Sequence, residues 1–144
     1  MKTSIRILQF DSPEQLDSIR LRERILRIPL GLKYSKEELR NEFDQIHIGA
    51  FSDNVIVGIL LLKPVDDQLI KMRQVAVETS LQRQRIGKDM VTFAEGWAKV
   101  NGYKRIELHA RQEAVQFYLH QDYEIVGEPF FEVGILHRKM VKNI

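Results

Sequence analysis

The sequence contains no cysteine and no long apolar segment. Without cysteine, disulfides, thiolate-bound metals and a cysteine nucleophile are excluded. The longest apolar run, from Val55 to Leu62, is far too short to span a bilayer. The first residues, Met1 to Ser4, lack the pattern of a signal peptide, and we expect a cytoplasmic protein without a membrane partner.

The chain also has little excess charge. Its 144 residues carry a formal net charge of +2, and they are 44% hydrophobic and 29% charged. This balance is ordinary for a globular domain, and the charge is too small to indicate a nucleic-acid partner. The four histidines lack the spacing of a zinc site, so we expect no metal. The length predicts a single domain over residues 1–144.

The spacing of apolar residues divides the chain into strands and helices. The predicted strands cover residues 4–9, 47–51, 55–62, 70–77, 106–110, 123–127 and 133–141, and the predicted helices cover 13–28, 36–39, 86–100 and 112–121. The order strand, loop, helix, strand over residues 70–110 is that of a right-handed parallel crossover, whereas the hairpins on either side are antiparallel. We therefore predict an α/β fold with a mixed, mostly antiparallel central sheet flanked by helices.

A few residues predict where these elements begin and end. Ser35 and Glu38 have the spacing of a capping box. Pro29 should end the first helix, and Gly102 should end the helix over 86–100 in a left-handed conformation. Ser52-Asp53-Asn54 should form the tip of a hairpin between two apolar strands.

The segment Gln82-Arg83-Gln84-Arg85-Ile86-Gly87-Lys88 lies between a predicted strand end and a predicted helix start. Backbone N–H groups at a helix start are unpaired, and they favour an anion. Gly87 allows a close approach of the backbone, and Arg83, Arg85 and Lys88 add positive charge, which together suit a diphosphate. The P-loop and dinucleotide patterns both fail because their glycines are missing. By itself, the segment could equally be a solvated basic turn.

The order of the surrounding motifs is more specific. A strand over 72–77 leads to Gln82-x-x-Arg85-x-Gly87, and a helix and a strand then lead to Ala114-x-x-Phe117-Tyr118. This order resembles the GNAT superfamily of N-acetyltransferases over nearly the whole chain. The sequence departs from the family pattern in two places. Arg85 replaces the first glycine of the family's loop, and Asp122-Tyr123 stands where the family often has glycine and phenylalanine.

The resemblance implies acetyl-coenzyme A as the co-substrate and direct transfer of its acetyl group to a primary or secondary amine. It also implies that Tyr118 protonates the departing thiolate and that a backbone N–H near Val75 polarises the thioester carbonyl. The cofactor-binding residues that it implies are Val75, Ala76 and Val77 along the pantetheine arm, and Gln82, Arg83, Gln84, Arg85, Ile86, Gly87 and Lys88 around the diphosphate.

A narrower set of residues resembles the branch that contains glyphosate N-acetyltransferase. The set comprises the segment Leu21-Arg22-x-Arg24-Ile25-Leu26-Arg27, Arg73, Ala110-Arg111 and His137. This resemblance implies that Arg27, Arg73 and Arg111 bind a small amine bearing a carboxylate or phosphonate, and that His137 is the base. Guanidinium groups suit such anions because two parallel hydrogen bonds fit their planar geometry.

Other interpretations of the catalytic candidates stay open. Tyr118 could be an ordinary half-buried aromatic residue on an amphipathic helix. His109 or a water relay could replace His137 as the base, since imidazole is the side chain whose charge changes near neutral pH. Glu132 and Glu42 are further candidates for a base or for an amine contact.

The arginines and the function as a whole also have alternatives. Arg73 could form a structural salt bridge with Glu107, and Arg27 could merely complement a helix dipole. The rival function is a non-catalytic acyl-coenzyme-A-binding sensor or partner-binding module. An RNA-binding domain is disfavoured because no aromatic residues lie among the basic residues of the 82–88 segment. A homodimer is one alternative for the assembly.

Overall fold

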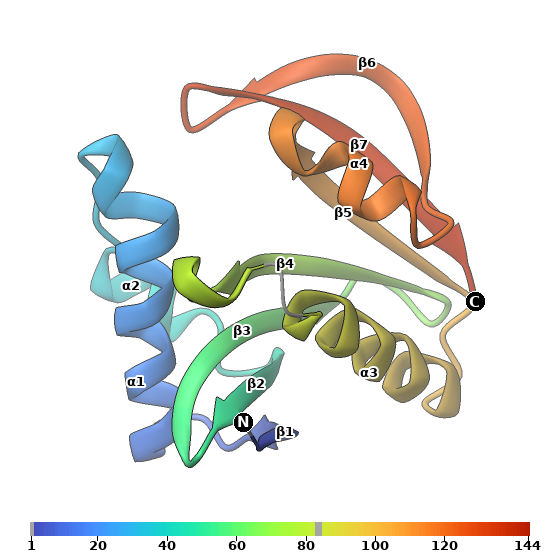
Figure 1. Ribbon diagram of the computed structural model, residues 1–144. Helices are drawn as coiled ribbons and strands as arrows, with labels where there is room; N and C mark the ends of the chain where they lie inside the picture. The colour runs from blue at the N-terminus through green and yellow to red at the C-terminus, as the bar shows by residue number, and fades with distance from the viewer. Residues whose placement is uncertain (1, 83–84) are drawn as a thin grey trace. The chain divides into compact units, whose positions relative to one another are not determined.

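The computed structural model describes residues 2–82 and 85–144, which fold into both strands and helices (Figure 1). The strands are β1 (Thr3–Leu8), β2 (Ile46–Ser52), β3 (Val55–Pro64), β4 (Leu69–Val77), β5 (Arg105–Arg111), β6 (Glu124–Glu132) and β7 (Ile135–Asn143). The α-helices are α1 (Pro13–Arg22), α2 (Lys36–Arg40), α3 (Ile86–Val100) and α4 (Val115–Leu119). A π-helical turn, η1 (Glu23–Arg27), and the 3-10 turns η2 (Ile28–Leu30), η3 (Thr79–Leu81) and η4 (Gln112–Ala114) complete them.

The strands of the described residues form one seven-stranded sheet in the order β1-β2-β3-β4-β5-β7-β6. β1 pairs with β2, β2 with β3, β5 with β7, and β6 with β7, all in antiparallel orientation. β4 and β5 pair in parallel, from Leu69 opposite Arg105 to Met72 opposite Leu108, and α3 lies between them in the chain. The predicted mixed, mostly antiparallel sheet with a parallel crossover over 70–110 is therefore confirmed.

The chain comprises two compact units. The first contains Met1–Lys63 and Gln74–Ala94, and the second contains Pro64–Arg73 and Glu95–Ile144. In the first unit, α1 packs beside the β1–β3 strands (Figure 1). Its core cluster consists of Leu8, Leu21, Phe51, Ile59, Leu61 and Ala76.

Close packing of α3 against β3 depends on Gly58 in the first unit. A Cβ atom at this position would lie 2.9 Å from the Met90 sulfur and 3.3 Å from the Ala50 Cβ. A larger residue here would require the flexible end of the Met90 side chain to move and Ala50 to shift slightly, so Gly58 leaves room for the first half of α3 to pack on β3.

In the second unit, β5 separates a buried face from a polar one. Ile106, Leu108 and Ala110 are buried, whereas the alternating residues Glu107, His109 and Arg111 are partly exposed. α4 packs against β5 (Figure 1), and Val115 and Tyr118 are its buried residues. The polar face of β5, β7 and β6 therefore carries His109, His137 and Arg111.

Several predicted boundaries are confirmed. Ser35 and Glu38 form both hydrogen bonds of a capping box, at 3.1 and 2.8 Å. Asp53 and Asn54 form the hairpin tip with φ angles of 50° and 69°. The helix over 86–100 matches α3, and Gly102 follows it with a φ of 91°. The boundaries at Asp53, Asn54 and Gly102 could be predicted because few residue types adopt a positive φ.

Two predicted boundaries are wrong. Pro29 does not end the helical segment, because it lies in the first turn of η2, where a backbone N–H has no helical partner and proline is tolerated. Gly31, with a φ of 71°, ends the segment instead. The strand predicted over 123–127 continues to Glu132. Gly127, with a φ of 75°, belongs to an irregularity in the β6–β7 register that the strand passes through.

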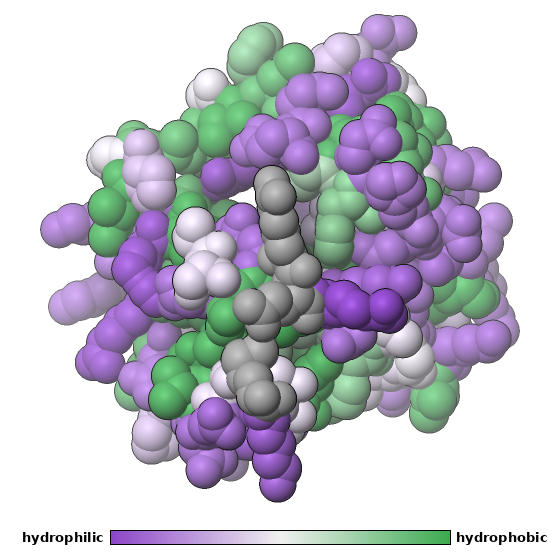
Figure 2. All heavy atoms as spheres, viewed as in Figure 1, coloured by the Kyte–Doolittle hydropathy of each residue, from purple (hydrophilic) through white to green (hydrophobic). Residues whose placement is uncertain are grey.

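Hydrophilic and hydrophobic residues are interleaved on the face that Figure 2 shows. The most exposed large apolar residues come from separate elements, and they include Val100, Phe131, Phe43 and Val55. Apolar residues scattered in this way are ordinary for a protein surface. None of the helices in the described ranges has the length and apolar character that a membrane span requires.

Candidate functional site

The C-terminal part of β4 is locally distorted. Gln74 has a φ of 55°, a left-handed conformation that is uncommon for a residue other than glycine. The three residues that follow it, Val75, Ala76 and Val77, are the predicted contacts of the pantetheine arm, and Ala76 and Val77 are buried. A residue held in this conformation within a strand is a feature that the surrounding structure must stabilise.

Tyr34 supplies that stabilisation in the first unit. Its hydroxyl donates a hydrogen bond to Oε1 of Gln74, and its backbone N–H donates to Oε2 of Glu23 at 3.2 Å. The guanidinium groups of Arg22 and Arg27 lie over its ring, at 4.5 and 4.3 Å from the centroid. Neither Tyr34 nor Gln74 was among the site residues predicted from the sequence. The available signal was a polar Gln74 within an otherwise apolar end of β4.

The predicted diphosphate loop leads from β4 into α3. The Gln82 side chain donates to the Val77 carbonyl oxygen at 3.1 Å, which joins the loop to the strand end. Arg83 and Gln84 lie outside the described residues. The N–H of Asp89 bonds to the Arg85 carbonyl oxygen at 2.9 Å. The amides that come before this first helical bond, those of residues 86–88, point along the helix axis, where an anion is favoured.

Arg85 itself occupies a left-handed conformation, with a φ of 67°. This is the position at which the sequence departs from the GNAT loop, where a glycine is usual. The backbone therefore keeps the conformation that glycine adopts freely, and the exposed Arg85 side chain adds a positive charge beside the helix start.

We expect Arg85→Gly to raise the free energy of unfolding by up to about 1 kcal/mol, because glycine relieves the strain of a positive φ. Arg85→Ala is the matched control, since it removes the same charge and keeps the strain. Urea denaturation of the two variants compares them directly. Equal stability of the glycine and alanine variants would contradict a strained loop.

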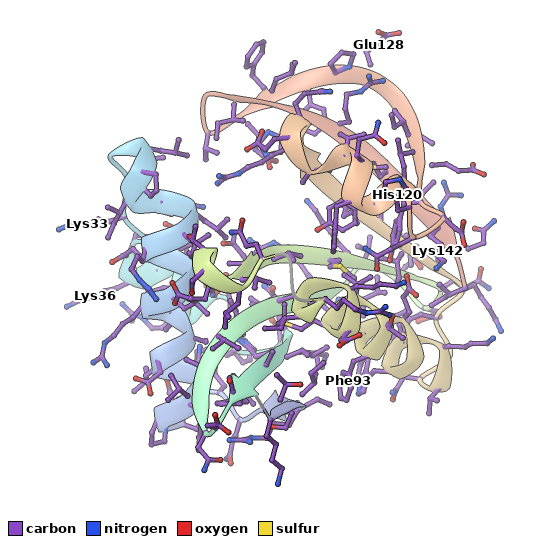
Figure 3. The ribbon with its side chains drawn as sticks, viewed as in Figure 1. Lys33, Lys36, Phe93, His120, Glu128 and Lys142 are labelled. Carbon is purple, nitrogen blue, oxygen red and sulfur yellow. The ribbon has the colours of Figure 1, made fainter. Side chains whose placement is uncertain are left out.

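Tyr118 lies on α4 in the second unit, and 5% of its surface is exposed. The rings of Phe117 and Tyr123 pack edge-on against it, with centroids at 4.9 and 5.6 Å. It is thus more buried than the half-buried residue considered from the sequence. Burial raises the pKa of the Tyr118 hydroxyl well above its usual value, so this group stays protonated near neutral pH. His120, at the end of the same helix, is exposed (Figure 3).

His137 and His109 share one carboxylate. Nδ1 of His109 lies 3.1 Å from Oε1 of Glu132, and Nε2 of His137 lies 3.7 Å from Oε2 of the same residue. Nδ1 of His137 contacts the Ile135 carbonyl oxygen at 2.8 Å. Phe130 contacts both imidazoles, edge-on to His109 at 4.9 Å and stacked on His137 at 5.9 Å. The structure thus joins three residues that the sequence analysis had considered separately as bases.

The charge state of Glu132 follows from this cluster. Burial raises the pKa of the Glu132 carboxyl, but the hydrogen bond from His109 and the charges of His109, His137 and Lys71 outweigh burial, so the pKa lies below its usual value. Glu132 is therefore ionised at neutral pH. Its favourable contribution is present above the pKa of an unfolded glutamate, and it is lost as the pH falls through the lowered pKa.

The three predicted substrate arginines have different surroundings. Arg111 lies directly opposite His137 in the β5–β7 register, so the two side chains lie on the same face. Arg73 is partly buried on β4, and Glu107, considered as its partner, forms an ion pair with Lys139 at 3.4 Å. Arg27 belongs to the first unit, where it contacts the Tyr34 ring and lies 3.8 Å from Glu38.

Glu42 is not placed to act as a base. It is 4% exposed, and both of its carboxylate oxygens accept hydrogen bonds from Arg22, at 2.8 and 2.9 Å.

An open cavity of about 780 Å³ lies in the second unit, apart from the candidate catalytic and binding residues. It is found where β4 and β5 begin, and its lining includes none of the predicted catalytic or binding residues.

Comparison with known proteins adds to this geometry. Residues 30–144 match the family model described as "Acetyltransferase (GNAT) domain". The spermidine N(1)-acetyltransferase of Thermoplasma acidophilum is 31% identical over 93 residues, which cover 59% of this chain and 57% of that protein. Among solved structures, a proposed N-acetyltransferase from Lactobacillus plantarum has a TM-score of 0.87 at 20% identity, with 99% of each chain covered. A GNAT acetyltransferase from Elizabethkingia anophelis with acetyl-CoA bound has a TM-score of 0.72 at 22% identity, with 99% of this chain and 98% of that chain covered.

Proposed function

The chain belongs to the acetyltransferase (GNAT) family and is an N-acetyltransferase, and we propose that it transfers the acetyl group of acetyl-coenzyme A directly to a small amine that bears a carboxylate or phosphonate. The observation that carries the choice of substrate is Arg111 opposite His137 in the β5–β7 register. The guanidinium that we propose to bind the anion and the candidate base thus lie side by side on one face. Such a substrate is the one implied by the resemblance of the sequence to the branch that contains glyphosate N-acetyltransferase.

Acetyl-coenzyme A is held by backbone groups of the first unit in this proposal. Val75, Ala76 and Val77 pair with the pantetheine arm as an added strand would. The loop Gln82–Lys88, which includes Arg83 and Gln84, holds the diphosphate. The left-handed Arg85 and the start of α3 directly after it support this assignment, because a helix start favours an anion and Arg85 adds local positive charge.

The chemistry requires a base for the amine and an acid for the sulfur. His137, directly or through water, takes a proton from the substrate ammonium, and the free amine nitrogen attacks the thioester carbonyl carbon. A backbone N–H near Val75 polarises the carbonyl oxygen. As the carbon–sulfur bond breaks, Tyr118 donates its hydroxyl proton to the thiolate, and coenzyme A leaves as the thiol. The nitrogen of the new amide then gives its extra proton to the tyrosinate, directly or through water, which restores Tyr118. The raised pKa keeps the buried Tyr118 hydroxyl protonated but makes it a weaker acid, so its assignment as the proton donor rests on the family resemblance.

The charge of the acceptor amine distinguishes the proposed anionic substrate from a cationic amine. Arg27, Arg73 and Arg111 would bind an anion, whereas the relative from Thermoplasma acidophilum is named for spermidine, a polycation. Glycine and glycinamide form a matched pair of amines that differ in the carboxylate. We expect kcat/KM for glycine or aminomethylphosphonate to exceed that for glycinamide by about 10-fold or more, because a charged hydrogen bond is lost with the amide.

A thiol-release assay at fixed acetyl-CoA measures these values. Arg111→Gln should abolish the preference for the anionic amine, and Arg111→Lys should keep part of it because the charge remains while the two-pronged geometry is lost. Equal kcat/KM for glycine and glycinamide, or a preference for spermidine, would contradict an acidic acceptor.

A homodimer remains a prediction, which light scattering of the purified protein checks.

A further inference from the structure

We propose that Glu132 is a positioning residue that stabilises the protonated form of His137 and holds His109 beside it. The proposal rests on the proposed role of His137 as the base. It follows from the three-residue cluster in the second unit, in which each carboxylate oxygen of Glu132 faces one imidazole nitrogen.

The hydrogen bond of His137 to Ile135 decides which nitrogen is the base. A carbonyl oxygen can only accept, so Nδ1 of His137, 2.8 Å from the Ile135 oxygen, must carry a proton. In the neutral imidazole, Nε2 is then the nitrogen with a free lone pair. This is the atom that faces Glu132, at 3.7 Å. The tautomer of His137 is thus set by β7 itself, with the basic nitrogen directed toward the carboxylate.

Glu132 interacts differently with the two protonation states of His137. An unprotonated Nε2 and a carboxylate are both acceptors, so they form no hydrogen bond. Once Nε2 takes a proton, the imidazolium and the carboxylate attract each other. The side chain of His137 is 5% exposed, so little water is available to stabilise its charge, whereas Glu132 is 46% exposed and can pass the proton to water. Glu132 therefore favours the step in which His137 accepts the substrate proton.

His109 fixes the other oxygen of Glu132. Because a carboxylate accepts, Nδ1 of His109 donates to Oε1 at 3.1 Å. Lys71 Nζ also lies 3.5 Å from Nδ1 of His109, which places a further positive charge beside the cluster. Phe130 packs against both rings and limits their rotation. His109 thus holds the Glu132 carboxylate in place. In this proposal, His137 is the base and His109 has a structural role.

Several positively charged side chains lie near Glu132 and His137 in the second unit. Arg111 on β5 lies opposite His137, and the charge of Lys71 on β4 acts on the Glu132 carboxylate. Lys139 on β7 is paired with Glu107 on β5, so this pair adds little net charge. Glu132 on β6 is therefore the counter-ion for the positive charges around His137 in the described part of the second unit.

The test compares Glu132→Gln with Glu128→Gln, a change of the same kind on the same strand at a residue that points away from β6 into solvent (Figure 3). We expect Glu132→Gln to move the acid limb of the kcat/KM profile to lower pH by about half to one pH unit, because the protonated imidazole loses its partner. At the plateau, kcat should fall several-fold because His137 is a weaker base, while KM for acetyl-CoA stays unchanged. Glu132→Asp should restore part of both effects, and Glu128→Gln should match the parent chain.

Nitrogen NMR of the imidazoles gives a readout that does not need turnover. At pH 6.5, the protonated fraction of His137 should be lower in Glu132→Gln than in the parent chain, with the Nδ1–H tautomer dominant in the neutral form of both. An unchanged protonated fraction would overturn the proposal even if the enzyme acetylates amines. Conversely, a changed fraction in a protein that acetylates no amine would support the coupling and reject the proposed function. A variant that alters KM for the amine alone, with an unmoved pH profile, would make Glu132 a substrate contact and overturn the positioning role.

Discussion

Tyr118→Phe should lower kcat by about 10²- to 10³-fold and leave the Kd for acetyl-CoA nearly unchanged, because it removes the acid that protonates the departing thiolate. The variant keeps the ring, which packs between Phe117 and Tyr123, so the fold of α4 should be preserved. Stopped assays of thiol release give kcat, and calorimetry gives the Kd. Since burial raises the pKa of Tyr118, the parent enzyme should show no loss of activity from ionisation of this hydroxyl below about pH 10.

Tyr103→Phe is the matched control for this experiment. Tyr103 belongs to the same unit, and its ring stacks on Trp97 at 6.3 Å, but it has no proposed part in the reaction. Its kcat should stay within about two-fold of the parent value, as is usual for a change outside the site. Equal kcat values for the parent chain and the Tyr118 variant would remove Tyr118 from the mechanism.

Glu42→Ala should lower the free energy of unfolding by about 3–5 kcal/mol, because it leaves the Arg22 guanidinium buried without its partner. The Arg22 side chain is 0% exposed, and both of its terminal nitrogens bond to Glu42. Burial by itself lowers the pKa of Arg22, but Glu42 outweighs that effect and raises the pKa above its usual value. In Glu42→Ala this effect is lost, but arginine remains protonated near neutral pH because its intrinsic pKa is so high. The variant therefore keeps a buried charge without its partner, and urea denaturation should show the full cost.

The exposed pair Asp17–Arg20 provides the control. Their side chains are 55% and 83% exposed, so Asp17→Ala should change the free energy of unfolding by less than about 0.5 kcal/mol. The double variant Arg22→Met with Glu42→Leu should be more stable than Glu42→Ala, since no unpaired charge remains. A loss below about 1 kcal/mol in Glu42→Ala would show that the buried pair contributes little.

The elements with strong local signals could be predicted from the sequence. α3 has the predicted bounds because its apolar residues recur at helical spacing and Gly102 follows it with a positive φ. The parallel crossover also follows from local order, since a strand, a helix and a strand of these lengths have few alternative arrangements. The replacement of the loop glycine by Arg85 was visible in the sequence, and its left-handed backbone is what that position implied.

The contacts among distant residues could not be predicted. Glu132, His109 and His137 come together because β6 pairs with β7 and β7 pairs with β5, and this register depends on an irregularity near Gly127 that no local pattern specifies. The pairing of Glu42 with Arg22 depends in the same way on packing between α1 and the segment before β2. A single sequence shows which residues can carry charge, but it does not show which of them meet.

The most direct test of the account is the stoichiometry of thiol release and amine acetylation in the purified protein. We predict that acetyl-coenzyme A alone releases little thiol, and that adding glycine or aminomethylphosphonate releases one thiol for each acetylated amine that mass spectrometry detects. Acetyl-coenzyme A that binds with measurable affinity, while no amine raises thiol release above the blank, would contradict the account and favour an acyl-coenzyme-A sensor.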